Sequence, residues 1–225
     1  MQAAHILSLD RDEDVRMALA ERLIKLLPDL DPGRQSQIYG FVAQALGTLA
    51  LDQVLAIRRA LSSALKDSAN TPPKVAGQLA RDLEREVAEP ILRFCAALAD
   101  EDLLDILKQH PADWAVQAVA GREKVSAKVA RAVIATADRI AGLILIKNTG
   151  AVISPDLMEE IVEKSKQYPE WQQPIAVHKA LPPAMARTLA AFADAAVQDL
   201  LARRTDLDER AAKEIAGLVR RRMEF

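Results

Sequence analysis

The sequence has few aromatic residues, one cysteine and no long apolar run, and each shortage excludes a class of protein. Aromatic residues make up 4% of the 225 residues, which favours closely packed helices over sheets because aromatic residues prefer strands. The single cysteine, Cys95, excludes a disulfide framework and a cysteine zinc site. The longest apolar run, residues 140–146, is far shorter than the ~20 residues that span a bilayer.

Neither sign of charge dominates the chain. Its 30 basic and 32 acidic residues leave a net charge of −2, so no overall field attracts nucleic acid or anionic lipid. The first residues lack the basic start and the apolar stretch of a signal peptide. We therefore expect a cytoplasmic protein that does not enter a membrane.

Catalytic and cofactor motifs are also missing. The sequence contains no Gly-x-Ser-x-Gly elbow and no Gly-x-Gly phosphate loop. The three histidines, His5, His110 and His178, are scattered, and structural roles are expected for them. Cys95 follows Phe94 on an apolar seam, which predicts a buried, inert thiol. We expect no enzyme activity, no bound metal and no organic cofactor.

The sequence does contain one repeat, present in three copies between residues 114 and 196. Val125, Ile153 and Leu181 are spaced 28 residues apart. Two further apolar series keep this spacing: Val129, Leu157 and Met185, and Val133, Ile161 and Leu189. Positions four and eight residues apart lie on one face of a helix. A single helix pair cannot bury such a face, whereas stacked pairs can, so the repeat predicts an α-solenoid.

Helix boundaries follow from the residues between these positions. Ser126, Ser154 and Pro182 fall on the 28-residue grid where a helix is expected to start. The segment Asn148-Thr149-Gly150 predicts a helix end in the left-handed conformation. The third copy is expected to end in a helix that runs from residue 183 to about residue 203.

The N-terminal part is also expected to be helical. Its most prominent feature is an apolar seam from Val75 to Leu98, which predicts one long helix bent at Pro90. Gly40 lies inside another predicted helix, where a close neighbouring helix would explain it. We expect about twelve helices in three regions: an N-terminal helical region over residues 1–98, the three repeats over 99–204, and a C-terminal helix over 205–225.

Two tryptophans and one row of charges are the candidate binding features. Trp114 and Trp171 begin corresponding helices and are expected to pack against neighbouring pairs; the alternative is an exposed anchor for a partner. The outer sides of the second helices carry charges that change sign between copies. We predict that these charges bind a protein partner: Lys128, Arg131, Glu159, Glu160 and Arg187. The alternative is a solvated surface without a partner.

Several segments resemble a bacterial family of unknown function with HEAT-like α-helical repeats. The segments that carry the resemblance are residues 87–92, 118–122, 148–154 and 181–182, within a likeness that covers residues 10–200. The family pattern favours Arg where His178 stands. The resemblance implies an α-solenoid of HEAT-like helix pairs on which the N-terminal helical region packs, and it implies no activity.

Three classes of function remain open at this point. The first is a non-enzymatic protein-interaction or scaffold module with a protein partner, which could also form homo-oligomers. The second is a HEAT-like nucleic-acid-binding protein or base-excision DNA glycosylase. Nucleic acid is disfavoured because the charge at equivalent repeat positions reverses from Lys128 to Asp156. The third is a signalling domain with a phosphoacceptor histidine, for which no surrounding motif is found.

Overall fold

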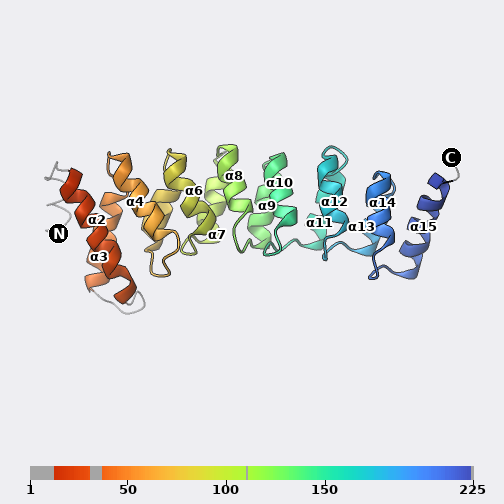
Figure 1. Ribbon diagram of the computed structural model, residues 1–225. Helices are drawn as coiled ribbons and strands as arrows, with labels where there is room; N and C mark the ends of the chain where they lie inside the picture. Colours follow the sequence, from red (N-terminus) through yellow and green to blue (C-terminus); the bar gives the residue numbers. More distant parts are fainter. Residues whose placement is uncertain (1–12, 31–36, 110, 224–225) are drawn as a thin grey trace. The chain divides into compact units, whose positions relative to one another are not determined.

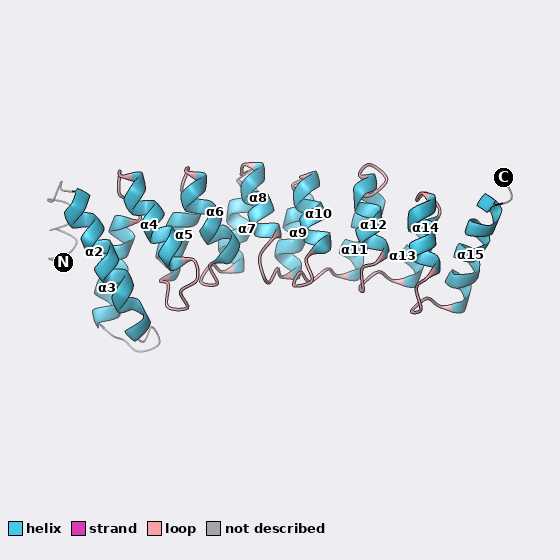
Figure 2. Cartoon of the chain, viewed as in Figure 1, coloured by secondary structure: helices cyan, strands magenta, loops and turns pink. Residues whose placement is uncertain are grey.

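A computed structural model describes residues 13–30, 37–109 and 111–223, which form helices joined by loops (Figures 1 and 2). These residues include fourteen α-helices, two short 3-10 helices and no strand. The predicted all-α class is therefore confirmed. None of the described helices combines the length and the apolar character that crossing a bilayer requires.

The chain divides into two compact units, Met1–Arg122 and Glu123–Phe225. The first unit holds α2 (Glu13–Leu26), η1 (Leu27–Asp29), α3 (Gln37–Leu49), α4 (Leu55–Leu65), α5 (Pro73–Ala80), α6 (Arg85–Phe94), α7 (Asp100–Lys108) and α8 (Asp113–Ala120). The second holds α9 (Ala127–Ala135), α10 (Arg139–Lys147), α11 (Pro155–Lys164), η2 (Pro169–Trp171), α12 (Gln172–Ala176), α13 (Pro183–Ala190), α14 (Ala195–Ala202) and α15 (Glu209–Met223).

In the first unit, most helices pack on the helix next but one. The contacts join α2 to α4, α4 to α6 and α6 to α8, while α3 contacts α5, and Figure 1 shows α4, α6 and α8 side by side. Ile57 and Leu61 of α4 and Val87 and Ile91 of α6 are all fully buried. Their spacing of four residues places each pair on one face of its helix, and that face is the packed one.

The second unit repeats this arrangement and follows the 28-residue grid. Contacts join α10 to α12 and α12 to α14 in one row, and α11 to α13 and α13 to α15 in the other. All positions of the three apolar series except Met185, which is partly exposed, are buried. Helix starts also match: the Ser126 side chain accepts a hydrogen bond from the Val129 amide, and α11 and α13 begin with Pro155 and Pro183.

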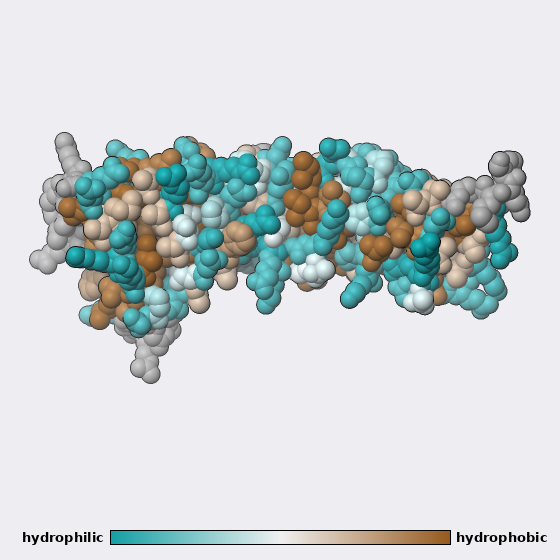
Figure 3. All heavy atoms as spheres, viewed as in Figure 1, coloured by the Kyte–Doolittle hydropathy of each residue, from teal (hydrophilic) through white to brown (hydrophobic). Residues whose placement is uncertain are grey.

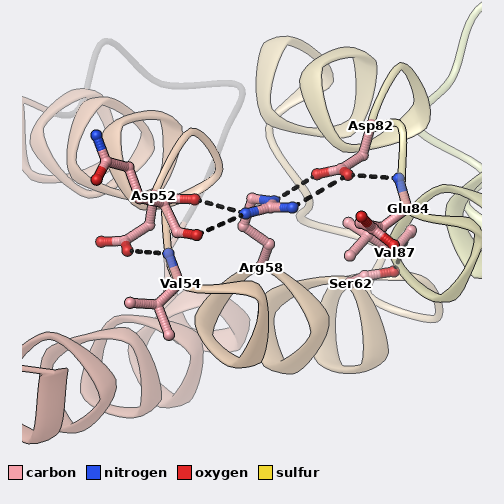
Figure 4. Close-up of polar contacts among 8 residues, drawn as sticks. Asp52, Val54, Arg58, Ser62, Asp82, Glu84 and Val87 are labelled. Atoms are coloured by element: carbon pink, nitrogen blue, oxygen red, sulfur yellow. Dashed lines mark hydrogen bonds and ion pairs between the residues drawn. The ribbon is translucent and has the colours of Figure 1, made fainter.

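The predicted long helix over residues 72–98 is wrong, because α5 ends at Ala80 and α6 begins at Arg85. Figure 4 shows the reason. The Arg58 guanidinium donates to both carboxylate oxygens of Asp82, at 2.6 and 3.4 Å, and to the carbonyl of Asp52 at 2.7 Å. The same Asp82 carboxylate accepts the Glu84 amide at 2.9 Å, and this turn ends the helical path before Pro90.

A second predicted helix, over residues 183–203, also consists of two. Helix α13 ends at Ala190, and the Asp194 carboxylate starts α14 by accepting the Val197 amide at 2.9 Å. Asp accepts first-turn amides readily, so it favours a helix start over the middle of a helix. These two breaks account for fourteen α-helices where about twelve were expected.

Two predictions about glycines and turns are also wrong. Among the described residues only Ala137 has a positive φ, of 59°, so neither Asn148 nor Gly150 is left-handed. Gly150 is required for space instead, because a Cβ there would lie 1.8 Å from the Glu123 carbonyl oxygen. A Cβ at Gly40 would meet no atom within 4 Å, so no neighbouring helix explains that glycine.

Two arginines, Arg122 and Arg204, close the ends of neighbouring helices. The Arg122 guanidinium donates to the carbonyls of Leu92 and Cys95 at the end of α6. Arg204 follows α14 and donates to the carbonyls of Ala176 and His178 at the end of α12, at 2.8 and 3.0 Å. The last carbonyls of a helix lack partners within it, so each arginine completes the neighbouring helix of its own unit.

The surface mixes polar and apolar side chains. On the face shown in Figure 3, small hydrophobic patches lie among hydrophilic side chains. Ile140, Val152 and Val177 of the second unit are about half exposed, at 49%, 57% and 62%. Scattered apolar residues of this kind are ordinary on protein surfaces.

Candidate protein-interaction surface

The predicted charged row lies on α9, α11 and α13 of the second unit. Each of these helices follows a buried grid residue, Val125, Ile153 or Leu181, so the three present corresponding sides to solvent. Lys128 and Arg131 of α9 and Glu159 of α11 are exposed, whereas Glu160 and Arg187 are partly buried. The buried grid positions therefore determine which side chains of α9, α11 and α13 face solvent and belong to the row.

Ion pairs connect successive helices along this row. Arg131 pairs with Asp156 and, at 3.7 Å, with Glu160. Lys164 lies 3.5 Å from the other Glu160 oxygen and donates to the Ile134 carbonyl at the end of α9. Thus each helix contributes one residue to the link between them: Arg131 from α9 and Lys164 from α11. Such exposed pairs contribute little stability, about 0–1 kcal/mol each, but they fix the orientation of both carboxylates.

Arg187 belongs to a separate link. Its guanidinium pairs with Glu214 of α15 at 3.4 Å, and Glu214 also binds Arg210. The hydrogen bond from Arg210 is the main reason that the pKa of Glu214 lies below its ordinary value. The structure therefore brings Arg131 and Glu160 together, but it engages Arg187 with a residue outside the predicted set.

Lys128 and Glu159 are the members of the row without such a link. Within the described ranges neither side chain forms an ion pair with another residue, and both are exposed. These two charges are opposite in sign and lie on neighbouring helices. They are the residues of the row that are most available to a partner.

A groove of about 500 Å³ runs between α11 and α13. Four carboxylates line it, together with Lys164, Met185 and Thr188; the acids are Asp156, Glu159, Glu160 and Glu163. Hydrogen bonding to Ser154 lowers the pKa of Asp156, and Arg131 adds to this effect. Lys166 pairs with Glu163 at 2.7 Å. The groove is thus predominantly acidic, with its acids partly neutralised along both edges.

The sequence did not reveal Asp156, Lys164 or Glu214 as parts of this surface. A signal was present: Arg131 is 25 residues from Asp156 and 29 from Glu160, which brackets the 28-residue repeat. Opposite charges at such separations face each other when equivalent helices pack side by side. Predicting these ion pairs requires knowing how α9 is rotated about its axis relative to α11. The apolar pattern determines that rotation only to within one helical turn.

The two tryptophans have different environments. Trp171 is buried, its indole N–H donates to the Arg139 carbonyl at 3.0 Å, and its ring lies against Gly142. Trp114 is partly exposed, with the Arg85 guanidinium 5.9 Å from its ring centroid. The packing expected for Trp171 is confirmed.

The histidines and the cysteine show no catalytic arrangement in the described part of the chain. His5 and His110 lie outside the described residues. His178 is partly buried and its Nδ1 accepts the Ala180 amide at 3.1 Å; burial, followed by the charge of Arg204, lowers its pKa. Cys95 is buried, and burial raises the pKa of its thiol. No cluster of three metal-binding side chains occurs among residues 13–30, 37–109 and 111–223.

Comparison with known proteins gives one match. A family model described as "Uncharacterised protein conserved in bacteria (DUF2336)" matches residues 87–224, which include the whole of the second unit's described part. A search of curated proteins returned no match, and neither did a search of solved structures.

Proposed function

The chain belongs to the DUF2336 family of uncharacterised bacterial proteins, and we propose that it is a non-enzymatic protein-interaction module. We propose further that its repeats, over residues 99–204, form an α-solenoid of HEAT-like helix pairs. Two features support the repeat assignment: the 28-residue grid of buried residues, and the contacts that join α10 to α12, α12 to α14, α11 to α13 and α13 to α15. Solenoids bind partners on extended surfaces that their repeats build together.

The observation that carries the proposal is the row on α9 and α11. Its ion pairs hold Arg131 and Glu160 in place while Lys128 and Glu159 remain exposed and unlinked. A surface that alternates in sign selects a partner with the complementary alternation, because charge pattern sets register and specificity more than affinity. In HEAT-like solenoids the second helices line the concave side, which would place this row in a groove.

The nucleic-acid alternative finds less support in the same residues. Binding to duplex DNA requires Lys or Arg side chains that neutralise several phosphates. The groove between α11 and α13 presents four carboxylates instead, and the cations nearby, Arg131, Lys164 and Lys166, are paired with acids. A duplex would have to break these pairs in order to approach.

The test is a reversal of the two unlinked charges, Lys128→Glu with Glu159→Lys. This double variant keeps the net charge and every ion pair described above. We expect its melting temperature to stay within about 2 °C of the parent, because exposed charges change stability by at most ~0.5 kcal/mol. It should lose the partner that the parent chain retains from an extract of its native cells, identified by mass spectrometry.

A matched control reverses an ion pair elsewhere in the second unit. Arg139 of α10 pairs with Glu170 at 3.2 Å, and their side chains are 62% and 36% exposed. Arg139→Glu with Glu170→Arg also preserves net charge and should retain the partner. If the Lys128/Glu159 variant retained the same partner as the parent, or if the parent retained none, the proposed surface would be refuted.

A further inference from the structure

A pocket between α10 and α12 of the second unit takes no part in the charged row. Its volume is about 390 Å³, at the small end of the range for ligand pockets, which is about 300–1,000 Å³. The two helices pack on each other (Figure 1), and the pocket lies where they end, at Lys147 and at Ala176. None of its lining residues belongs to α9, α11 or α13.

Half of the lining is apolar. Ile146, Ala151, Pro174 and Val177 form this part. Ile146 is buried, whereas Val177 is 62% exposed. An occupant with an apolar body would contact both residues and remove Val177 from water, which is favourable.

The charged part of the lining has one sign only. Lys147 and Lys179 line the pocket together with no carboxylate. Both lysines are exposed, and neither side chain forms an ion pair or a hydrogen bond with another residue of the described ranges. In contrast, Lys164 and Lys166 of the same unit are paired with acids. The pocket thus has an unbalanced positive charge, which attracts an anion.

Neither lysine is needed to complete a helix end. Lysines near a helix C-terminus often bind its last carbonyls, but Arg204 does this for α12, where it donates to the carbonyls of Ala176 and His178 at 2.8 and 3.0 Å. At the end of α10 the Asn148 amide donates to the Leu145 carbonyl at 3.0 Å. Both ammonium groups are therefore left for a ligand.

Two neutral donors accompany the lysines. The Nδ1 atom of His178 accepts the Ala180 amide at 3.1 Å, so the proton of the neutral ring lies on Nε2, which is a donor. Burial lowers the pKa of this ring, which favours the neutral form. The Thr149 hydroxyl is the second donor in the lining. A carboxylate accepts several hydrogen bonds, so this set of donors suits it.

We propose that the pocket binds a carboxylate attached to a small apolar group, with the carboxylate between Lys147 and Lys179 and the apolar group against Ile146 and Val177. Phosphate is favoured at helix N-termini, whereas this pocket lies at C-terminal ends, whose partial negative charge disfavours a dianion more than a monoanion. Two sources carry the proposed chemistry: a free short-chain carboxylic acid, and the C-terminal residue of a polypeptide that ends in an aliphatic side chain.

NMR titration of the full chain tests the pocket and separates the two sources. The probes are N-acetyl-leucine and an otherwise uncharged five-residue peptide that ends in leucine. We expect saturable shifts of the Lys147, Val177 and Lys179 amides, with a dissociation constant of about 1 mM or tighter, as ligand efficiency allows for so small a probe. Equal affinity for both probes assigns the site to a free acid, and at least about tenfold tighter binding of the peptide assigns it to a polypeptide C-terminus.

Two analogues of the first probe test each half of the ligand. N-acetyl-leucine amide lacks the charge and acetate lacks the apolar group. Each should bind at least about tenfold more weakly than N-acetyl-leucine, because each loses its contacts with one half of the lining.

Variants assign the binding to named residues. Lys147→Met with Lys179→Met should weaken binding of N-acetyl-leucine at least about tenfold and leave the melting temperature within about 2 °C, because both side chains are exposed. Val177→Ser keeps both cations and should weaken binding at least about threefold. Lys128→Met is the matched control, since it also removes an exposed lysine of the second unit but not one that lines the pocket; it should bind like the parent.

Three results would overturn the proposal. They are the absence of saturable binding for both probes, an amide analogue that binds as tightly as the acid, and an unchanged affinity in the double lysine variant. Because the pocket shares no residue with the charged row, each of these results leaves the proposed interaction surface untouched.

Discussion

The two units connect their helices in the same places but with different chemistry. In the first, Arg58 of α4 holds Asp82 in the segment before α6, and these side chains are only 16% and 9% exposed. The corresponding connection in the second unit joins Arg139 of α10 to Glu170 before α12, and it is largely solvated. There the buried Trp171 provides the packing instead. The helix arrangement therefore determines where successive helices connect, but it does not determine which side chains form the connection.

The grooves differ in the same way. Between α3 and α5 the groove is mostly apolar, with Lys74 as its one charged lining residue, whereas between α11 and α13 it is acidic and bordered by ion pairs. A groove of the first kind suits an apolar surface, because burial of apolar area drives association there. A groove of the second kind selects by charge. Similar helix packing thus produces grooves of different chemistry in one chain.

The largest difference between the units is the space available for a side chain at two helical glycines, Gly142 and Gly40. A Cβ at Gly142 would lie 2.1 Å from the Trp171 ring, whereas one at Gly40 would meet nothing. Gly142→Ala should lower the free energy of unfolding by about 3 kcal/mol, because the buried ring has no space to yield. Gly40→Ala should raise it by about 0.5–1 kcal/mol through helix propensity. Urea denaturation monitored by Trp fluorescence measures both, and equal effects would contradict the packing described for Trp171.

The next contrast is between buried and exposed ion pairs. Arg58→Met leaves the Asp82 carboxylate partly buried without its cation and should cost about 2–4 kcal/mol. Arg139→Met removes a solvated pair and should cost less than about 0.5 kcal/mol. Hydrogen exchange should show loss of protection in α4 and α6 for the first variant and little change in α10 for the second. Similar losses would mean that burial does not distinguish the two links.

A smaller effect is expected at Ala137, the described non-glycine residue with a positive φ, between α9 and α10. The left-handed conformation costs a residue with a Cβ about 1 kcal/mol, which glycine avoids. Ala137→Gly should therefore stabilise the protein by about 0.5–1 kcal/mol, although glycine usually destabilises. Ala132→Gly, in the middle of α9, is the control and should destabilise by a similar amount. A loss of stability in both variants would show that the turn is unstrained.

The sequence predicted the helices and most of the buried apolar positions well because apolar spacing determines both. The grid residues Val129, Leu157 and Leu189 are buried as expected, and Ser126 caps its helix. The errors lie at breaks that depend on a partner distant in sequence. Asp82 ends a helical path because Arg58, 24 residues earlier, holds its carboxylate. Similarly, the requirement at Gly150 comes from the Glu123 carbonyl, not from the turn in which it lies.

The charged row was predictable residue by residue but not as a set of pairs. Solvent exposure of Lys128 and Glu159 follows from the grid, since both lie away from the buried positions. The link from Arg131 to Asp156 and Glu160 depends on how α9 is rotated against α11. The groove between α3 and α5 carried no charged or catalytic signature in the sequence, so only the packing of α3 on α5 reveals it.

The smallest expected effect is a pH dependence at His178 in the second unit. Burial, and then the Arg204 charge, hold the pKa of His178 below its ordinary value, and its Nδ1 can accept the Ala180 amide only while that nitrogen is unprotonated. Because the unfolded chain takes up this proton near pH 6.5, the contribution to stability is complete above about pH 6.5 and is lost as the pH falls towards the lower folded pKa. The charged groups near the ring are Lys147, Lys179 and Arg204, and the hydrogen bond from Arg204 lowers the pKa of Asp206. His178→Gln keeps an acceptor for the amide but does not titrate, so the parent should lose more melting temperature than this variant between pH 7.5 and pH 5.5. Equal losses in the two proteins would show that His178 does not sense pH, and an NMR titration of its ring would then give an ordinary pKa.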